Sequence, residues 1–115
     1  MAGAAAQLAG AVRRGLADAA EPDRAEPMRR YMKSELPFRG VEGRMQGRVF
    51  ARAFAEHPLA TFEEWRDAVL GLWRDAGARE ERYGAIALAQ HPAYRLFALD
   101  LRALPLYEEL VVTGA

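Results

Sequence analysis

Residues 25–41 have the sequence Ala-Glu-Pro-Met-Arg-Arg-Tyr-Met-Lys-Ser-Glu-Leu-Pro-Phe-Arg-Gly-Val, and this stretch decides the fold. Its apolar residues recur at i, i+3, i+4 and i+8, the spacing of one face of an α-helix. They are Met28, Tyr31, Met32 and Leu36. Pro37 ends the predicted helix, because the residue before a proline is pushed out of the α region. Gly40 can then take a positive φ in a sharp turn. A helix, an abrupt stop and a second helix predict a helical hairpin.

Five further helices are predicted on both sides of this stretch from the spacing of apolar residues. They cover residues 4–20, 42–57, 62–77, 78–90 and 101–113. The helix from residue 62 starts with a capping box, in which Thr61 is the N-cap and Glu64 follows three residues later. Glu80 and Glu81 lie in the first turn of the next helix, where the helix dipole favours anions. No stretch alternates with period two for long enough to indicate a strand, so the predicted fold is all-α.

An internal repeat favours stacked helical pairs. Residues 51–58 match residues 85–92 at an offset of 34, and both copies end in His-Pro. The same offset pairs Phe62 with Leu96, Trp65 with Leu99, Leu72 with Leu106 and Trp73 with Tyr107. A period of 34 residues with helix–turn–helix content is typical of helical-repeat proteins. We therefore predict one domain over residues 1–115, a short α-solenoid of about six helices in antiparallel pairs.

Composition excludes several classes of protein. At 51% hydrophobic and 28% charged residues, the 115-residue chain has the composition of a soluble globular domain. It contains no cysteine, which excludes disulfides and a thiolate nucleophile. His57 and His91 each precede a proline at a predicted helix end, where the helix dipole favours them, and their placement does not match a metal site. We predict no metal and no cofactor.

The chain shows no sign of a membrane or export signal. No apolar run approaches the roughly 18 residues of a transmembrane helix. The alanine-rich N-terminus lacks the positive residues that precede the apolar region of a signal peptide. We therefore expect a cytoplasmic protein without a membrane partner.

Charge is unevenly distributed along a chain whose net charge is zero. Residues 1–55 contain 10 Lys+Arg and 6 Asp+Glu, or +4, whereas residues 56–115 contain 6 and 10, or −4. Arg44, Arg48 and Arg52 follow one another at i+4 steps along a predicted helix. Such a row spans about 12 Å and reaches two consecutive phosphates of one DNA strand. The alternative is a solvated helix edge, with Arg52 paired to Glu56 four residues on.

Three separated stretches resemble one family. Glu-Pro-Met-x-x-Tyr-Met-Lys followed by Pro-Phe-x-Gly-Val, in residues 26–41, is similar to the N-terminal region of the DNA alkylation repair family, the HEAT-like-repeat DNA glycosylases that remove alkylated purines. Residues 79–88 (Arg-Glu-Glu-Arg-Tyr-Gly-Ala-Ile-Ala-Leu) resemble the family's second helical pair. Residues 104–113 (Leu-Pro-Leu-Tyr-Glu-Glu-Leu-Val-Val-Thr) resemble the segment that leads into its active site. The resemblance covers about residues 15–115 and implies a HEAT-like solenoid.

The resemblance also implies site residues and a partner. Tyr31 matches a tyrosine that lies against DNA near the lesion in relatives, and Lys33 matches a basic position. The alternative for Tyr31 is a core residue of its apolar stripe. The implied DNA-binding set is Tyr31, Lys33, Arg44, Arg48 and Arg52, and the implied partner is double-stranded DNA containing alkylated bases.

We expect this chain to lack the residues that catalyse base excision. In the family, the Asp of a Trp-Trp-Asp motif stabilises positive charge on the deoxyribose, and that motif follows the last matching segment. This chain stops at Ala115 without it, so we expect an N-terminal DNA-backbone-binding portion of an alkylpurine glycosylase, inactive alone. Trp65 and Trp73 are predicted core residues, and no residue is assigned a catalytic role.

An alternative function from another class is a non-enzymatic helical-repeat module that binds a protein partner. Steep loss of DNA binding with salt would separate the two, because phosphate contacts release counterions. An unstacked terminal helix would also leave its apolar residues bare and favour self-association. The residues expected there are Leu106, Leu110 and Val111.

Overall fold

A computed structural model describes residues 3–114, and the described part contains helices and no strands. Its elements are α1 (Ala4–Asp18), α2 (Pro22–Met32), α3 (Gly43–Glu56), α4 (Phe62–Arg74), α5 (Arg79–Ala89), the 3₁₀ helix η1 (Pro92–Tyr94), α6 (Arg95–Ala98), the 3₁₀ helix η2 (Leu101–Ala103) and α7 (Leu104–Gly114). The all-α prediction is confirmed. Among these helices, none has both the length and the apolar content needed to cross a membrane.

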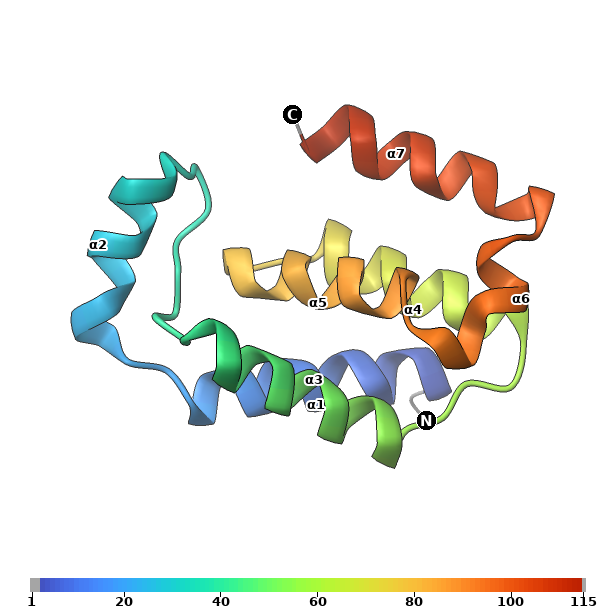
Figure 1. The fold of residues 1–115 in the computed structure, drawn as a ribbon, viewed down its shortest axis with the longest axis horizontal. Helices are drawn as coiled ribbons and strands as arrows, with labels where there is room; N and C mark the ends of the chain where they lie inside the picture. Colours follow the sequence, from blue (N-terminus) through green and yellow to red (C-terminus); the bar gives the residue numbers. More distant parts are fainter. Residues whose placement is uncertain (1–2, 115) are drawn as a thin grey trace.

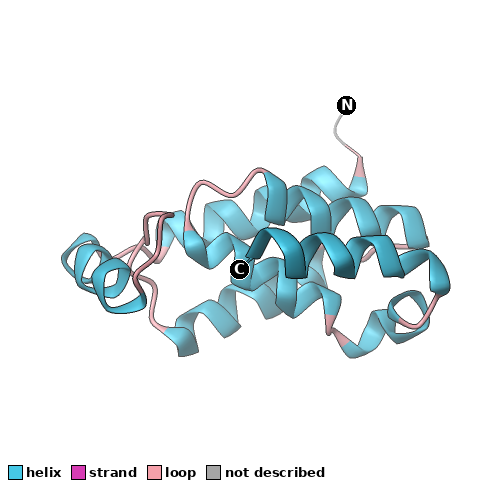
Figure 2. Ribbon diagram, turned by 90° about the horizontal axis from the view of Figure 1, so that it is seen from above, coloured by secondary structure: helices cyan, strands magenta, loops and turns pink. Residues whose placement is uncertain are grey.

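The helices stack in antiparallel neighbours, as a helical solenoid does. α1 packs against α3 and α4, α4 packs against α5 and α7, and α3 packs against α5. In Figure 1, α3 runs antiparallel to α1 and α5 runs antiparallel to α4, so that α3 and α5 begin at the same end of the molecule. That end also carries α2 (Figures 1 and 2).

The core lies between α1, α3, α4 and α5. Leu8, Val12 and Leu16 follow one another at i+4 steps on α1, and all three are fully buried. Trp65 is also fully buried, and its indole N–H donates to the carbonyl of Leu88 at 3.1 Å. Each fully buried aliphatic or aromatic side chain contributes about 1.5–3 kcal/mol of transfer free energy. The predicted core roles of Trp65 and Trp73 are confirmed.

Helix α2 differs from its prediction in length and in burial. It ends at Met32, four residues before the predicted end at Leu36, because Lys33 adopts the left-handed conformation (φ 52°, ψ 41°). The amides of Lys33 and Ser34 then donate to the carbonyls of Arg30 and Arg29, which is a Schellman motif. No residue of α2 is buried, and Tyr31 is 86% exposed. The alternative that made Tyr31 a core residue is therefore wrong.

The internal repeat holds up to the His-Pro dipeptide and then breaks. Only residues 57–61 connect α3 to α4, whereas residues 90–103 connect α5 to α7 and contain η1, α6 and η2. The predicted pairing of Phe62 with Leu96 is wrong, since Phe62 is buried and Leu96 is 84% exposed. The additional short helices shift α7 beyond the position that the offset of 34 residues predicts.

Helix α7 packs against α4 through one side, and its other side faces solvent. Leu106 is buried, which corrects the expectation that it lies bare, whereas Val111 is 74% exposed. The indole N–H of Trp73 donates to the hydroxyl of Thr113 at 2.7 Å. Self-association through the exposed apolar residues of α7 stays a prediction.

Candidate nucleic-acid interface

Helix α2 lies at one end of the molecule (Figure 1), and none of its residues is buried. The helix begins after Glu21, and Pro22 at its first position supplies the backbone angle of a helix start. Arg29 is paired with Glu26 at 2.6 Å, and the two charges largely neutralise each other. The exposed ring of Tyr31 and the exposed ammonium of Lys33 have no hydrogen bond or ion pair within residues 3–114.

The three predicted arginines of α3 lie on the side of the helix that faces away from the core. The opposite side buries Gln46, Phe50, Ala53 and Phe54. Arg52 forms an ion pair with Glu56 at 2.9 Å, and the hydrogen bond that Arg52 donates to this carboxylate raises the pKa of Arg52. Arg44 and Arg48 have no acidic partner in the described part of the chain. The helix edge thus combines one neutralised arginine with two whose charge is free.

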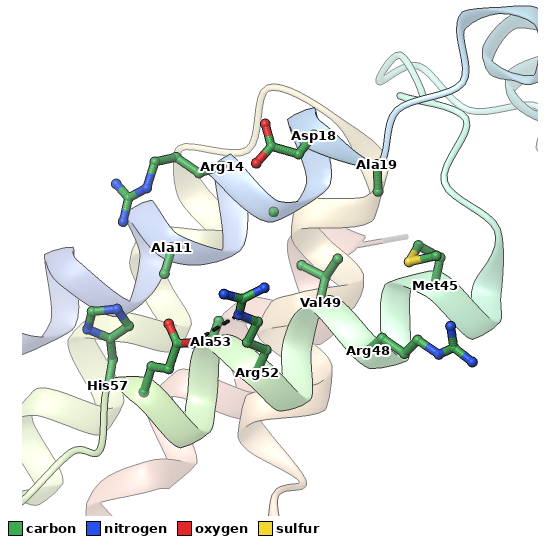
Figure 3. Close-up of a pocket in the computed structure, with 12 residues that line it drawn as sticks. Ala11, Arg14, Asp18, Ala19, Met45, Arg48, Val49, Arg52, Ala53 and His57 are labelled. Atoms are coloured by element: carbon green, nitrogen blue, oxygen red, sulfur yellow. Dashed lines mark hydrogen bonds and ion pairs between the residues drawn. The ribbon is translucent and has the colours of Figure 1, made fainter.

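Arg48 and Arg52 line an open groove of about 520 Å³ between α1 and α3. Its lining residues are Ala11, Arg14, Gly15, Asp18, Ala19, Met45, Arg48, Val49, Arg52, Ala53, Glu56 and His57. Figure 3 shows Arg52 reaching into the space between the two helices, whereas Arg14 and Arg48 point outward. Arg14, on α1, was not predicted as a site residue, and it adds a third cation to the groove.

A glycine brings the two walls of this groove close together. A Cβ atom on Gly15 would lie 2.7 Å from Cγ1 of Val49, a distance that no side chain tolerates without movement. The lining mixes apolar side chains, such as Val49 and Met45, with charged ones, among them the acidic Asp18 and Glu56.

The sequence analysis did not predict two arginines of α5 as site residues. Arg79 lies over the ring of Tyr83 at 5.7 Å, and Arg82 lies over the ring of Trp73 at 4.5 Å. Neither has an ion pair with a described acidic residue, and the Nε atom of each is buried without an acceptor. Stacking holds both guanidinium groups in place while leaving their charge unneutralised. The available signal was two arginines three residues apart on the polar face of a helix.

Glu80 and Glu81 are buried, which their predicted place in the first turn of a helix does not by itself imply. Both lie on the apolar face of α5 together with Gly84, Ala85 and Leu88, a spacing that is visible in the sequence. Glu81 forms an ion pair with Arg13 at 2.7 Å and accepts from the amide of Gly77 at 3.1 Å. Glu80 accepts only from backbone amides of residues 39–41. These carboxylates are therefore occupied inside the protein and do not neutralise Arg79 or Arg82.

The structure brings some of the predicted site residues together and leaves others apart. Arg48 and Arg52 share the groove with Arg14, whereas Arg44 lies outside its lining. Tyr31 and Lys33 lie on or next to α2, at the end of the molecule where α3 and α5 begin (Figure 1). Within residues 3–114, no group of three His, Cys, Asp or Glu side chains could hold a metal ion.

Comparison with known proteins identifies the family. No curated protein matches this chain. Residues 12–115, almost its whole length, match the model of the family described as DNA alkylation repair enzyme. The match includes all three stretches that carry the sequence resemblance, and it supports a role in DNA repair. The chain belongs to the DNA alkylation repair enzyme family.

Proposed function

We propose that this chain binds the backbone of duplex DNA that contains alkylated bases, as the backbone-binding part of an alkylpurine glycosylase acting in base-excision repair. The observation that carries the proposal is a set of four arginines without acidic partners on two neighbouring helices. They are Arg44 and Arg48 on α3 and Arg79 and Arg82 on α5. Cations that the protein leaves unpaired on adjacent elements are available to phosphate oxygens.

The helix ends add to this positive region. α3 and α5 begin at the same end of the molecule, but the first turn of α5 already holds the carboxylates of Glu80 and Glu81. The start of α3 carries about half a positive charge from its dipole, and Arg44 lies in its first turn, so side-chain and backbone charges reinforce each other there. Phosphate groups bind favourably at such positions.

Helix α2 supplies the part of the interface that reads the surface of a base. The exposed ring of Tyr31 presents an aromatic face next to the cation of Lys33. A base that has left the stack can pack on such a ring, and stacking on one aromatic side chain contributes about 1–3 kcal/mol. Tyr31 and Lys33 are therefore proposed to contact the duplex near the damaged base.

The test is the salt dependence of binding. Changing Arg44, Arg48 and Arg52 together to Gln should weaken binding to any duplex and lower the slope of log K against log salt, near 0.9 per lost phosphate contact. The expected fall is about 2 from the unpaired Arg44 and Arg48, and up to about 3 if Arg52 exchanges Glu56 for a phosphate. The matched control changes three paired arginines elsewhere, Arg66, Arg74 and Arg102, and removes the same charge.

The outcomes of this test are distinct. A fall in slope for the first variant alone supports the proposal. Equal slopes in the two variants would mean that only net charge matters and would contradict the assignment of α3. A binding constant that does not change with salt would favour the alternative of a protein-interaction module. Comparison of methylated with unmodified duplex tests whether alkylated bases add affinity.

A further inference from the structure

The carboxylate of Glu80 is fully buried and bonded to the loop that follows α2. Its oxygens accept from the amide of Arg39 at 2.9 and 3.1 Å, from that of Gly40 at 3.0 Å and from that of Val41 at 3.1 Å. Three successive backbone amides therefore converge on one side chain from a helix about forty residues further along the chain. Such a concave set of amides is an anion-binding nest.

A carboxylate satisfies this nest better than a neutral amide does. Both of its oxygens are acceptors, whereas a glutamine whose oxygen kept the bonds to Gly40 and Val41 would turn its NH₂ group toward the amide of Arg39. Hydrogen bonds to an ionised acceptor are stronger than those between neutral groups. The position of Glu80 in the first turn of α5 adds the favourable field of the helix dipole.

The same loop is fastened to the start of α2 on its other side. Gly40 has φ +81°, and a Cβ atom there would lie 2.0 Å from the carbonyl oxygen of Glu21. The amide of Glu21 donates to the carbonyl of Arg39 at 3.0 Å. The amide of Arg79 donates to the carbonyl of Pro37 at 2.8 Å, which adds a second bond from α5 to this loop. Residues 37–41 therefore connect α5 directly to the first residues of α2.

Helix α2 makes few packing contacts with the rest of the protein. None of its residues is buried, and it makes no extensive packing contact with another helix. In Figures 1 and 2 it stands at the end of the molecule, apart from the stacked helices. Its orientation therefore depends on the adjoining loops. The loop of residues 37–41 is held by Glu80, by the buried side chains of Phe38 and Val41, and by the side-chain amide of Gln46, which donates to the carbonyl of Val41 at 2.8 Å.

We propose that Glu80 is a positioning residue, which sets the orientation of α2 and thereby places Tyr31 and Lys33 for contact with DNA. The second half of this statement rests on the proposed function. The two segments that meet here, residues 37–41 and 79–83, belong to two of the stretches on which the family resemblance rests. The contact between Glu80 and the loop gives a physical reason why these two segments occur together in the resemblance.

The first experiment measures hydrogen exchange in Glu80→Gln. Amides of α2 and residues 39–41 should exchange about 10- to 100-fold faster, as expected from loss of hydrogen bonds to a charged acceptor, while amides of α4 keep their protection. The control is Glu64→Gln, which removes another carboxylate that accepts from loop amides, those of Ala60 and Thr61. This control should leave α2 unchanged.

Gly40→Ala provides a second variant if Glu80→Gln does not fold. It disturbs the contact between the loop and Glu21 without removing the buried carboxylate, and it should produce the same faster exchange in α2. Unchanged exchange of α2 in a folded variant of either kind would overturn the positioning role.

The second experiment is a double-mutant cycle on duplex binding. Glu80→Gln should weaken binding about tenfold in the wild-type background and should have little further effect when Tyr31 and Lys33 are both alanine, because coupled residues are not additive. Full additivity would show that Glu80 does not act through α2. If the Tyr31 and Lys33 changes alone leave binding intact, the role of α2 in DNA binding is wrong, and the exchange result still decides the effect of Glu80 on α2.

Discussion

Lys33 is the described non-glycine residue with a positive φ, and it ends α2. It occupies the C′ position of a Schellman motif, where glycine is usual because any Cβ atom is crowded in the left-handed region. Lys33→Gly should therefore stabilise the end of α2 by roughly 0.5–1 kcal/mol after allowing for the greater freedom of glycine in the unfolded chain. The measurement is hydrogen exchange of the Ser34 amide, which should slow roughly 2- to 5-fold.

Lys33→Ala is the control for this prediction. It removes the ammonium group but keeps a Cβ atom, so the exchange of Ser34 should not slow. Both variants lose the same proposed DNA contact and should weaken duplex binding equally. Slower exchange of the Ser34 amide in the alanine variant would show that the charge of Lys33, and not its backbone conformation, destabilises the end of α2.

Two glycines should respond in opposite ways to the same change. At Gly40 an added methyl group would overlap the carbonyl of Glu21, so Gly40→Ala should destabilise the fold by about 2 kcal/mol or more. Gly47 lies inside α3 with no atom within 4 Å of an added Cβ atom, so Gly47→Ala should stabilise by about 1 kcal/mol. Urea denaturation of the two variants measures both effects, and equal shifts would contradict this interpretation.

Sequence spacing predicted some residue environments and missed others for physical reasons. It predicted the exposure of the α3 arginines and the capping box of Thr61 and Glu64, because both depend only on neighbours within a helical turn. It did not predict the burial of Glu80. That environment depends on a loop about forty residues away in the chain, and periodicity within one helix carries no information about such a partner.

At the scale of elements, apolar spacing predicted six helices with ends correct to within a few residues at most positions. The prediction of α2 was too long because Pro37 was the visible helix breaker, while the left-handed Lys33 carried no sequence signal. The short helices η1, α6 and η2 were missed because each is a single turn, too short for a periodic pattern. Helices of more than two turns were therefore the predictable part of the fold.

The attachment of α7 to α4 should depend on pH. Arg74 donates to Glu109 at 2.5 and 2.6 Å, and this hydrogen bond lowers the pKa of Glu109 below its ordinary value of 4.5. A lowered pKa means that the pair stabilises the folded state above the pKa of the unfolded chain and that this stability is lost as pH falls through the folded pKa. The midpoint of thermal unfolding should therefore be higher in the wild type than in Glu109→Gln near pH 7.

This difference in midpoint should shrink as pH falls below about 4.5, because the wild-type carboxylate becomes protonated. Glu108→Gln serves as the control, since Glu108 is exposed and has no ion pair among the described residues. A difference between wild type and Glu109→Gln that stays constant down to pH 3.5 would show that the ion pair does not contribute. High salt should reduce the effect at pH 7, because the pair is on the surface.

At the scale of the whole molecule, net charge is a poor guide to the interface. The chain is neutral, and its acidic and basic side chains are paired to a similar extent, so a positive region depends on where the unpaired charges lie. Arg44 and Arg48 on α3 and Arg79 and Arg82 on α5 have no described acidic partner. Glu80 and Glu81 are buried and bonded to backbone amides and to Arg13, so neither forms an ion pair with Arg79 or Arg82. The distribution of partners, which only a structure provides, thus explains how a neutral protein can present a positive region to DNA.

The arrangement of charges also predicts that these 115 residues bind DNA without excising a base. Cleavage of an N-glycosidic bond builds positive charge on the sugar, and a fixed anion in a site that excludes water stabilises it. The described groove offers little anionic field, because its lining holds three arginines, Arg14, Arg48 and Arg52, against two carboxylates, and one of these, Glu56, is already paired with Arg52. Glu80 and Glu81 are buried and bonded inside the protein.

The assay is release of 7-methylguanine from methylated duplex DNA by the purified chain, with duplex binding measured in the same samples. We expect salt-sensitive binding and release at the spontaneous rate, since loss of one preorganised electrostatic partner already lowers the rate about 10²–10³-fold. Release clearly above the spontaneous rate would contradict this prediction. Asp18→Asn would then locate the activity, because Asp18 is the acidic residue of the groove that has no described ion-pair partner. Loss of release in that variant would place the catalytic anion on α1, within the groove and beside the arginines proposed to hold the backbone.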